Sequence, residues 1–213
     1  MKKSLIALAM TASATLAAGT IAAQQPQIPG QVDASRVTAG EYKLDPSHTL
    51  VSWQVSHFGF NDYFGLFGDI EGTMMLDPAD IGATSFDITV PITSVAVPSE
   101  GLRDHLLRPG KEGASPDFFG PEPAPARFVS TSVRRTSDTT AVASGQLTMN
   151  GNTGPVTMLV EFTGAGENPM NKAQTVGFHA RATIDRTQWG IDYAAPMVSS
   201  NVDLEISAAF EKQ

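Results

Sequence analysis

Alternation of apolar and polar residues dominates the chain from residue 42 onward. Between residues 49 and 57, one face carries Val51, Trp53, Val55 and His57, whereas the other face is mostly polar. This period of two is typical of a strand with one buried face. The pattern recurs in the segments 69–76, 86–92, 127–133, 145–149, 156–162, 178–184 and 202–210. The sequence therefore predicts about eight strands.

The segments between these strands contain residues that favour turns. Asp77-Pro78 predicts a turn, and Asn150-Gly151 predicts a tight hairpin. A short helix is expected over 98–107, with Ser99 as its N-cap. The Pro-rich segment 109–125 follows as a long irregular loop.

About eight strands with turn-rich joints predict an all-β domain, either a closed barrel or a sandwich. An eight-stranded barrel either holds one small ligand or is filled by its own side chains. The residues predicted to face inward are mixed in size, from Trp53 and Phe86 to Gly72 and Ala180. Small inward residues leave room for a ligand, but they also suit ordinary close packing against large ones. The pattern alone leaves both interiors open.

The N-terminal region predicts export. Lys2 and Lys3 precede an uncharged run rich in Ala and Leu, and small residues lead up to Ala22 and Ala23. This is the layout of a secretory signal peptide, expected over residues 1–23 and cleaved near Ala22 or Ala23. The polar segment 24–40 is interpreted as a flexible linker, and the folded domain is expected over 41–213. The predicted location is the periplasm.

Composition narrows the range of partners. Without Lys2 and Lys3, 12 basic residues oppose 22 acidic ones, which gives a net charge of −10. Such a charge repels phosphate backbones, so nucleic acid is not an expected partner. The chain has no cysteine, which rules out disulfides and thiolate chemistry. No stable membrane anchor, metal site or hydrolase motif is recognised in the sequence.

Several segments together resemble the YceI-like family of periplasmic lipid-binding proteins. They are YKLDPSHTLVSWQVSHFGF (42–60), FGLFGDIEGTMMLDP (64–78), RDHLLR (103–108), SPDFF (115–119), PARFVSTSV (125–133) and GQLTMNGNTGPVTM (145–158). The resemblance implies an eight-stranded antiparallel lipocalin-like barrel with a long polyisoprenoid or similar amphiphile in its lumen. It also implies a carrier rather than an enzyme, with no cofactor other than the bound lipid. The segments 109–113 and 120–125 are longer than is usual in the family.

The expected ligand site combines inward strand residues with an aromatic run near one end of the barrel. The candidate ligand-binding residues are Val51, Trp53, Val55, His57, Phe58, Tyr63, Phe64, Phe67, Ile70, Met74, Phe86, Ile88 and Phe178. The aromatic run 58–67 is interpreted either as a loop packed by its own rings or as an apolar rim for lipid access.

The histidines allow structural and functional interpretations. His57 either donates a hydrogen bond to a ligand head group or is satisfied by the protein. His48 is expected to order the turn at 45–47. Asp104 and His105 are adjacent on the predicted helix and do not face each other, which favours a structural ion pair over a catalytic pair.

Three functions remain open from the sequence. The first is a carrier of a long-chain isoprenoid, either a polyprenol or a quinone-like lipid. The second is an enzyme that acts on a small isoprenoid, with His57, Asp104 or His105 as acid–base groups. The third is an envelope stress-response interaction module with a filled core and no ligand. The oligomeric state is open, and a homodimer is one arrangement.

Overall fold

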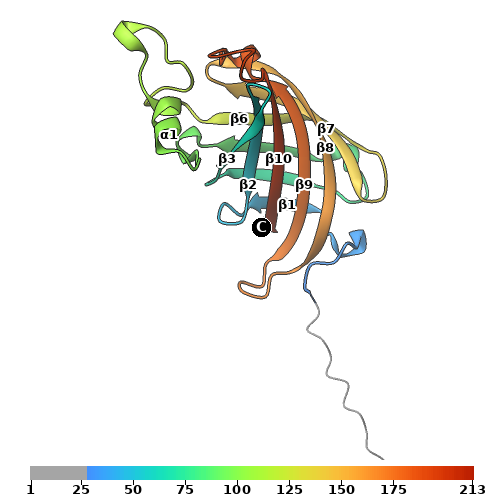
Figure 1. Ribbon diagram of the computed structural model, residues 1–213. Coiled ribbons are helices and arrows are strands. Elements are labelled where there is room, and N and C mark those ends of the chain that lie inside the picture. Colours follow the sequence, from blue (N-terminus) through green and yellow to red (C-terminus); the bar gives the residue numbers. More distant parts are fainter. Residues whose placement is uncertain (1–27) are drawn as a thin grey trace, which may run out of the picture.

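The computed structural model describes residues 28–213 (Figure 1). The predicted signal peptide and the first four residues of the predicted linker lie outside the described residues. The described part of the linker contacts the folded domain. Gln31 and Ala165 exchange two backbone hydrogen bonds, with N···O distances of 3.0 and 2.8 Å. A short 3₁₀ turn, η1 (Ala34–Arg36), follows before the first strand.

Ten strands form one antiparallel sheet. They are β1 (Gly40–Leu44), β2 (Leu50–His57), β3 (Asn61–Phe67), β4 (Glu71–Leu76), β5 (Ser85–Val90), β6 (Ala126–Arg135), β7 (Thr140–Met149), β8 (Asn152–Glu167), β9 (Gln174–Asp185) and β10 (Asn201–Lys212). Each of the eight predicted segments overlaps one of these strands. β5 ends at Val90, because Pro91 follows it and has no backbone N–H to donate to a neighbouring strand.

The sheet closes on itself because β1 pairs with both β4 and β10. The eight strands β1 and β4–β10 therefore form a complete ring, which confirms the predicted eight-stranded barrel. β1 was not among the eight predicted segments, and the predicted segment 49–57 forms β2 outside the ring. β2 pairs with the first half of β10 and β3 pairs with β2, so these two strands extend the barrel beyond the ring. Figure 1 shows the long strands β8–β10 curving along one side of the barrel.

One segment was assigned incorrectly as a loop. The aromatic run 58–67 was expected to be either a packed loop or a rim, but Asn61–Phe67 forms β3. Tyr63, Gly65 and Phe67 lie opposite Val55, Trp53 and Val51 on β2. The alternation was hidden because Gly65 contributes no apolar side chain to the inward face. The Trp53 indole occupies the space where a Cβ at position 65 would lie, so a close aromatic contact replaces that side chain.

The helix is α1 (Glu100–Leu107), and the Ser99 hydroxyl accepts a hydrogen bond from the Leu102 N–H at 3.2 Å, as expected of an N-cap. The loop after α1 contains one short turn, η4 (Lys111–Gly113), and is otherwise irregular. The other 3₁₀ turns are η2 (Ile81–Ala83), η3 (Ile92–Ser94) and η5 (Arg186–Trp189). Within residues 28–213, no helix is long and apolar enough to cross a membrane.

The barrel has two distinct ends. At the mouth end, the β2–β3 turn (58–60) meets the segment 190–198, since the Phe58 N–H donates to the Met197 carbonyl at 2.8 Å. α1 joins this end, because His105 and Tyr193 pack ring against ring at 4.9 Å. At the far end, the β6–β7 turn (136–139) lies close to η2, and Arg135 donates to the Pro78 carbonyl at 3.3 Å.

Tyr42 supports the ring where it closes. Its side chain is fully buried on β1, between Met74 of β4 and Lys212 of β10 in the register. Its hydroxyl donates to the Thr38 carbonyl at 2.7 Å. The ring therefore closes over a packed aromatic side chain whose polar atom has a partner.

Tyr42→Ala is expected to destabilise the fold by about 3–5 kcal/mol, because it removes a buried ring at the closing strand. Tyr42→Phe should cost about 1 kcal/mol, since it removes only the hydrogen bond. Urea denaturation measures both. Lys43→Ala, an exposed neighbour on the same strand, should stay within about 0.5 kcal/mol of the wild type. Equal losses for Tyr42→Ala and Lys43→Ala would contradict the packing role of Tyr42.

Candidate functional site

The interior of the barrel is a cavity of about 740 Å³. All ten strands contribute lining residues, and most of these are aliphatic or aromatic. The volume lies within the range of small-molecule sites. The sequence was compatible with a ligand cavity or with an interior filled by side chains, and the structure has the cavity.

Most of the candidate residues meet in this cavity. Val51, Trp53, Val55, His57, Phe58, Tyr63, Phe67, Ile70, Met74, Phe86, Ile88 and Phe178 all line it. Phe64 is the exception, since its side chain is 57% exposed and is absent from the lining. The reason is the strand register: Phe64 lies between Tyr63 and Gly65 on β3, so it points to the opposite face.

The candidate set underrepresents the second half of the chain. The strands β7–β10 contribute a large share of the wall, including Ala143, Val156, Met158, Val160, Ala180, Ala182, Leu204, Ile206 and Phe210. Their alternation is visible in the sequence and marks the inward face. α1 and the loop after it add Leu102, His105, Phe118 and Phe119, and the mouth-end segment adds Tyr193. Strand periodicity cannot identify these last residues because they lie outside the strands.

Small residues keep the cavity open. Ala143, Ala180 and Ala182 are buried and line the wall, each with a single methyl group. Phe86 and Phe128 stack on one another at 5.6 Å. An eight-stranded ring is narrow enough for larger side chains to fill it, so these alanines help to leave space for a ligand.

Polar side chains lie near the two ends of the cavity. His57, Tyr63, His105 and Tyr193 line the mouth end. Arg135, Ser137, Asp138 and Thr139 line the far end, where the first three are exposed and Thr139 is half-buried. An elongated ligand would thus meet apolar walls along its length and polar groups at its ends.

His105 joins three segments at the mouth. Its Nε2 lies 2.7 Å from Asp117 Oδ2, and Arg108 donates to the same carboxylate oxygen at 2.9 Å. The imidazole also packs edge-on against Phe118 at 5.0 Å. These contacts fasten α1 to the loop 109–125. The side-chain contact of His105 is with Asp117 in the loop and not with its neighbour Asp104, which does not line the cavity.

Arg186 fixes the other side of the mouth. It is 5% exposed, and its guanidinium donates to the carbonyls of Ile191, Val198 and Ser199 at 2.7–2.9 Å. Burial lowers the pKa of this guanidinium, whereas nearby Asp192 and Asp185 raise it. The three hydrogen bonds hold the segment 191–199 in place beside the cavity.

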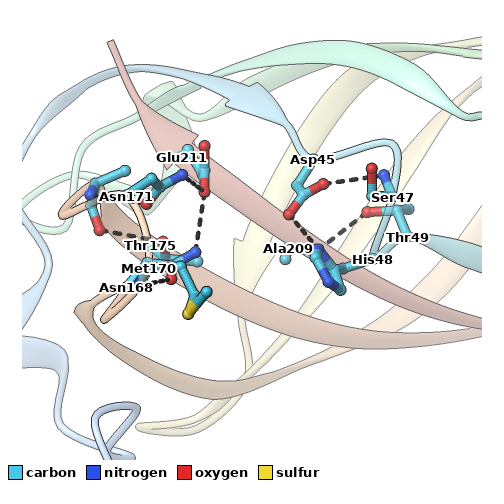
Figure 2. Close-up of polar contacts among 11 residues, drawn as sticks. Asp45, Ser47, His48, Thr49, Asn168, Met170, Asn171, Thr175, Ala209 and Glu211 are labelled. Atoms are coloured by element: carbon cyan, nitrogen blue, oxygen red, sulfur yellow. Dashed lines mark hydrogen bonds and ion pairs between the residues drawn. The ribbon is translucent and has the colours of Figure 1, made fainter.

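His57 and His48 have separate environments. His57 lines the cavity, and its ring lies edge-on to Phe58 at 4.4 Å. His48 lies outside the barrel, where its Nδ1 is 2.6 Å from Asp45 Oδ2 (Figure 2). The Asp45 carboxylate also accepts from the Ser47 N–H at 2.9 Å. His48 therefore orders the 45–47 turn, as the sequence predicted.

An outer groove lies beside this turn, and Figure 2 shows the polar contacts along it. Asn168 and Asn171 both donate to Glu211 Oε1, at 3.2 and 2.7 Å. These polar groups satisfy one another and tie the β8–β9 turn to β10, so the groove has a structural explanation. Among residues 28–213, no group of three or more His, Asp or Glu side chains is arranged to hold a metal ion.

Comparison with known proteins identifies close relatives. The model of the YceI-like domain matches residues 42–210. A UPF0312 protein of Pseudomonas putida (strain F1) is 35% identical over 185 residues, which cover 85% of this chain and 92% of the relative. Among solved structures, Burkholderia cenocepacia BcnA matches with a TM-score of 0.65 at 20% identity, over 78% of this chain and 98% of BcnA.

A second solved structure is a polyisoprenoid-binding domain from Saccharophagus degradans, which is implicated in plant cell wall breakdown. It matches with a TM-score of 0.54 at 10% identity, over 83% of this chain and all of that domain. Both structural likenesses concern the fold.

Asp117→Asn is expected to loosen the loop 109–125 and to lower stability at neutral pH. Hydrogen bonds from Arg108 and His105 hold the pKa of the Asp117 carboxyl below its ordinary value of 3.8. A carboxyl with a lowered folded pKa contributes stability above its unfolded pKa and loses that contribution as the pH falls through the folded value. The difference in stability between Asp117→Asn and the wild type should therefore be largest near pH 7 and should shrink below about pH 4.

Thermal unfolding between pH 7 and pH 3 measures this difference. Glu112→Gln is the control, because it removes one negative charge from the same loop at an exposed position. Identical pH profiles for Asp117→Asn and Glu112→Gln would show that the contacts of Asp117 do not stabilise the loop.

Proposed function

Because the chain belongs to the YceI-like family, we propose that it is a carrier that holds a long-chain isoprenoid, a polyprenol or a quinone-like lipid, inside the barrel. The observation that carries the proposal is the apolar cavity of about 740 Å³. The similarity to a polyisoprenoid-binding domain supports the ligand class. The twelve candidate residues in the cavity wall are the proposed lipid contacts, with His57 near the head group.

The energetics suit such a ligand. Burying one methylene group contributes roughly 0.8 kcal/mol, so about twenty isoprenoid carbons contribute about 16 kcal/mol. Association and ordering of the complex cost several to more than ten kcal/mol. Tight binding is therefore achievable through apolar contact alone, and polar groups at the ends of the cavity orient the ligand.

We expect the proposed carrier to act in the periplasm, because the sequence predicts a signal peptide and an apolar lipid that moves between membranes there needs shielding from water. The net charge of −10 expected after cleavage keeps such a carrier soluble.

The alternative of an enzyme has less support. Of its proposed acid–base groups, His57 and His105 line the cavity, but Asp104 and the Asp117 carboxylate that contacts His105 are not part of the wall. The alternative of an interaction module with a filled core does not account for the hollow interior.

The proposal predicts that organic extraction of the natively expressed protein, followed by mass spectrometry, yields one long-chain lipid per barrel. Ala180→Phe should reduce the lipid content and the uptake of added polyprenol at least tenfold, because a phenyl ring would project into the cavity. His179→Phe is the matched control, since it adds a ring to the exposed face of the same strand and should bind as the wild type does.

Circular dichroism checks that both variants fold. The proposal fails if the wild-type extract is empty and the protein takes up no added polyprenol. Equal uptake by Ala180→Phe and His179→Phe would mean that lipid binds outside the barrel.

A further inference from the structure

The mouth end carries large apolar side chains in solvent. Phe60, at the end of the β2–β3 turn, is 90% exposed, and Met197 on the neighbouring segment is 59% exposed. Phe58 is 45% exposed and also lines the cavity. The hydrogen bond from the Phe58 N–H to the Met197 carbonyl holds the two segments together. We call these three side chains the apolar tip.

The backbone conformation of the turn indicates that the Phe58 side chain has a role other than forming the turn. Phe58 and Gly59 have φ values of 55° and 71°. The β7–β8 turn has the same pair of positive values, 50° and 77°, and builds it from Asn150 and Gly151. Asn enters the left-handed region at little cost, whereas a bulky residue there is uncommon and strained. The β2–β3 turn thus keeps an aromatic side chain at a position where its geometry favours Asn.

The tip is continuous with the cavity. Phe58 belongs to both, so its ring carries apolar surface from the wall of the cavity to the outside. A long apolar ligand is almost insoluble in water and partitions into lipid bilayers. A surface of this kind at the mouth would let such a ligand pass between membrane and cavity without crossing water.

The charges at the mouth indicate the type of membrane surface. The segments 58–64 and 190–198 contain Asp62 and Asp192 but no Lys or Arg. Basic residues attract proteins to anionic lipids, so the two segments that carry the apolar tip provide no such attraction. Aromatic and other apolar side chains can insert into the interfacial region of a neutral bilayer without it.

We propose that the apolar tip is a membrane-docking surface that inserts transiently into neutral bilayers and brings the mouth of the cavity to the lipid. This inference rests on the proposed carrier function. It adds that transfer occurs during contact with the membrane rather than by diffusion of free lipid through water.

The test uses the full-length mature protein and the double variant Phe60→Ser/Met197→Ser. Neither residue lines the cavity, so polyprenol binding from detergent micelles should stay unchanged. Met170→Ser is the matched control, because Met170 is 89% exposed on the β8–β9 turn, away from the mouth. The assays are cosedimentation with dioleoylphosphatidylcholine vesicles and the rate of polyprenol transfer between such vesicles.

The wild type and Met170→Ser should cosediment and should transfer polyprenol at a rate that rises with vesicle concentration. The double variant should lose at least tenfold in both assays. Vesicles with added phosphatidylglycerol should bind the wild type no better than neutral ones. If the wild type binds polyprenol from micelles but the double variant transfers as fast as the control, the docking inference is wrong and the carrier proposal stands.

Failure of the wild type to bind polyprenol from micelles would overturn the carrier proposal instead. Sedimentation of the protein without vesicles tests whether the tip binds a second copy of the chain instead. If the wild type is a dimer and the double variant is a monomer, the tip is a dimer interface and the membrane proposal is wrong.

Discussion

Pairing of β1 with β10 is the constraint on which the rest of the structure depends. Only three residue pairs join them, from Tyr42 with Lys212 to Leu44 with Phe210. Without these pairs the sheet would be open, with β1 as a free edge and the apolar inner face accessible from the side. With them, eight strands form a ring whose width is set by strand number and tilt rather than by the side chains inside it. The cavity exists because this fixed ring is lined in part by alanines.

β10 serves both parts of the sheet. Its second half closes the ring through β1, and its first half carries the additional strands β2 and β3. The same strand thus joins the closed barrel to the mouth end, where the β2–β3 turn meets the segment fixed by Arg186. The hydrogen bonds of β10 therefore both close the ring and position the mouth through which the cavity is reached.

Most of the barrel can be predicted from the sequence because its strands each have one buried face. Alternation such as that of Val51, Trp53 and Val55 predicts which face of a strand is buried, and Asn150-Gly151 predicts a turn. β3 was missed because Gly65 interrupts the alternation of apolar residues. A glycine stands there since the Trp53 indole occupies the space of a side chain, and this contact cannot be read from the sequence. Phe64 was included in the candidate site for the same reason: without a strand over 61–67, no face could be assigned to it.

The candidate site was predictable along the strands and less so at the mouth. The hydrogen bond of His105 depends on Asp117, which the loop brings back to the helix, and Tyr193 contacts the same imidazole from a distant part of the chain. Neither contact has a local sequence pattern. The wall of the cavity follows from periodicity, whereas its opening follows from tertiary contacts between irregular segments.

The position of the lining residues has one more consequence. The wall runs from Tyr193 at one end of the barrel to exposed residues of the β6–β7 turn at the other. The lining therefore extends along the length of the barrel, and the width of the eight-stranded ring limits the cross-section of what the interior can hold. For the proposed carrier, such a lining distinguishes neighbouring members of a homologous lipid series less by their length than by their cross-section. Branching and ring size, which change the cross-section, would distinguish one ligand from another.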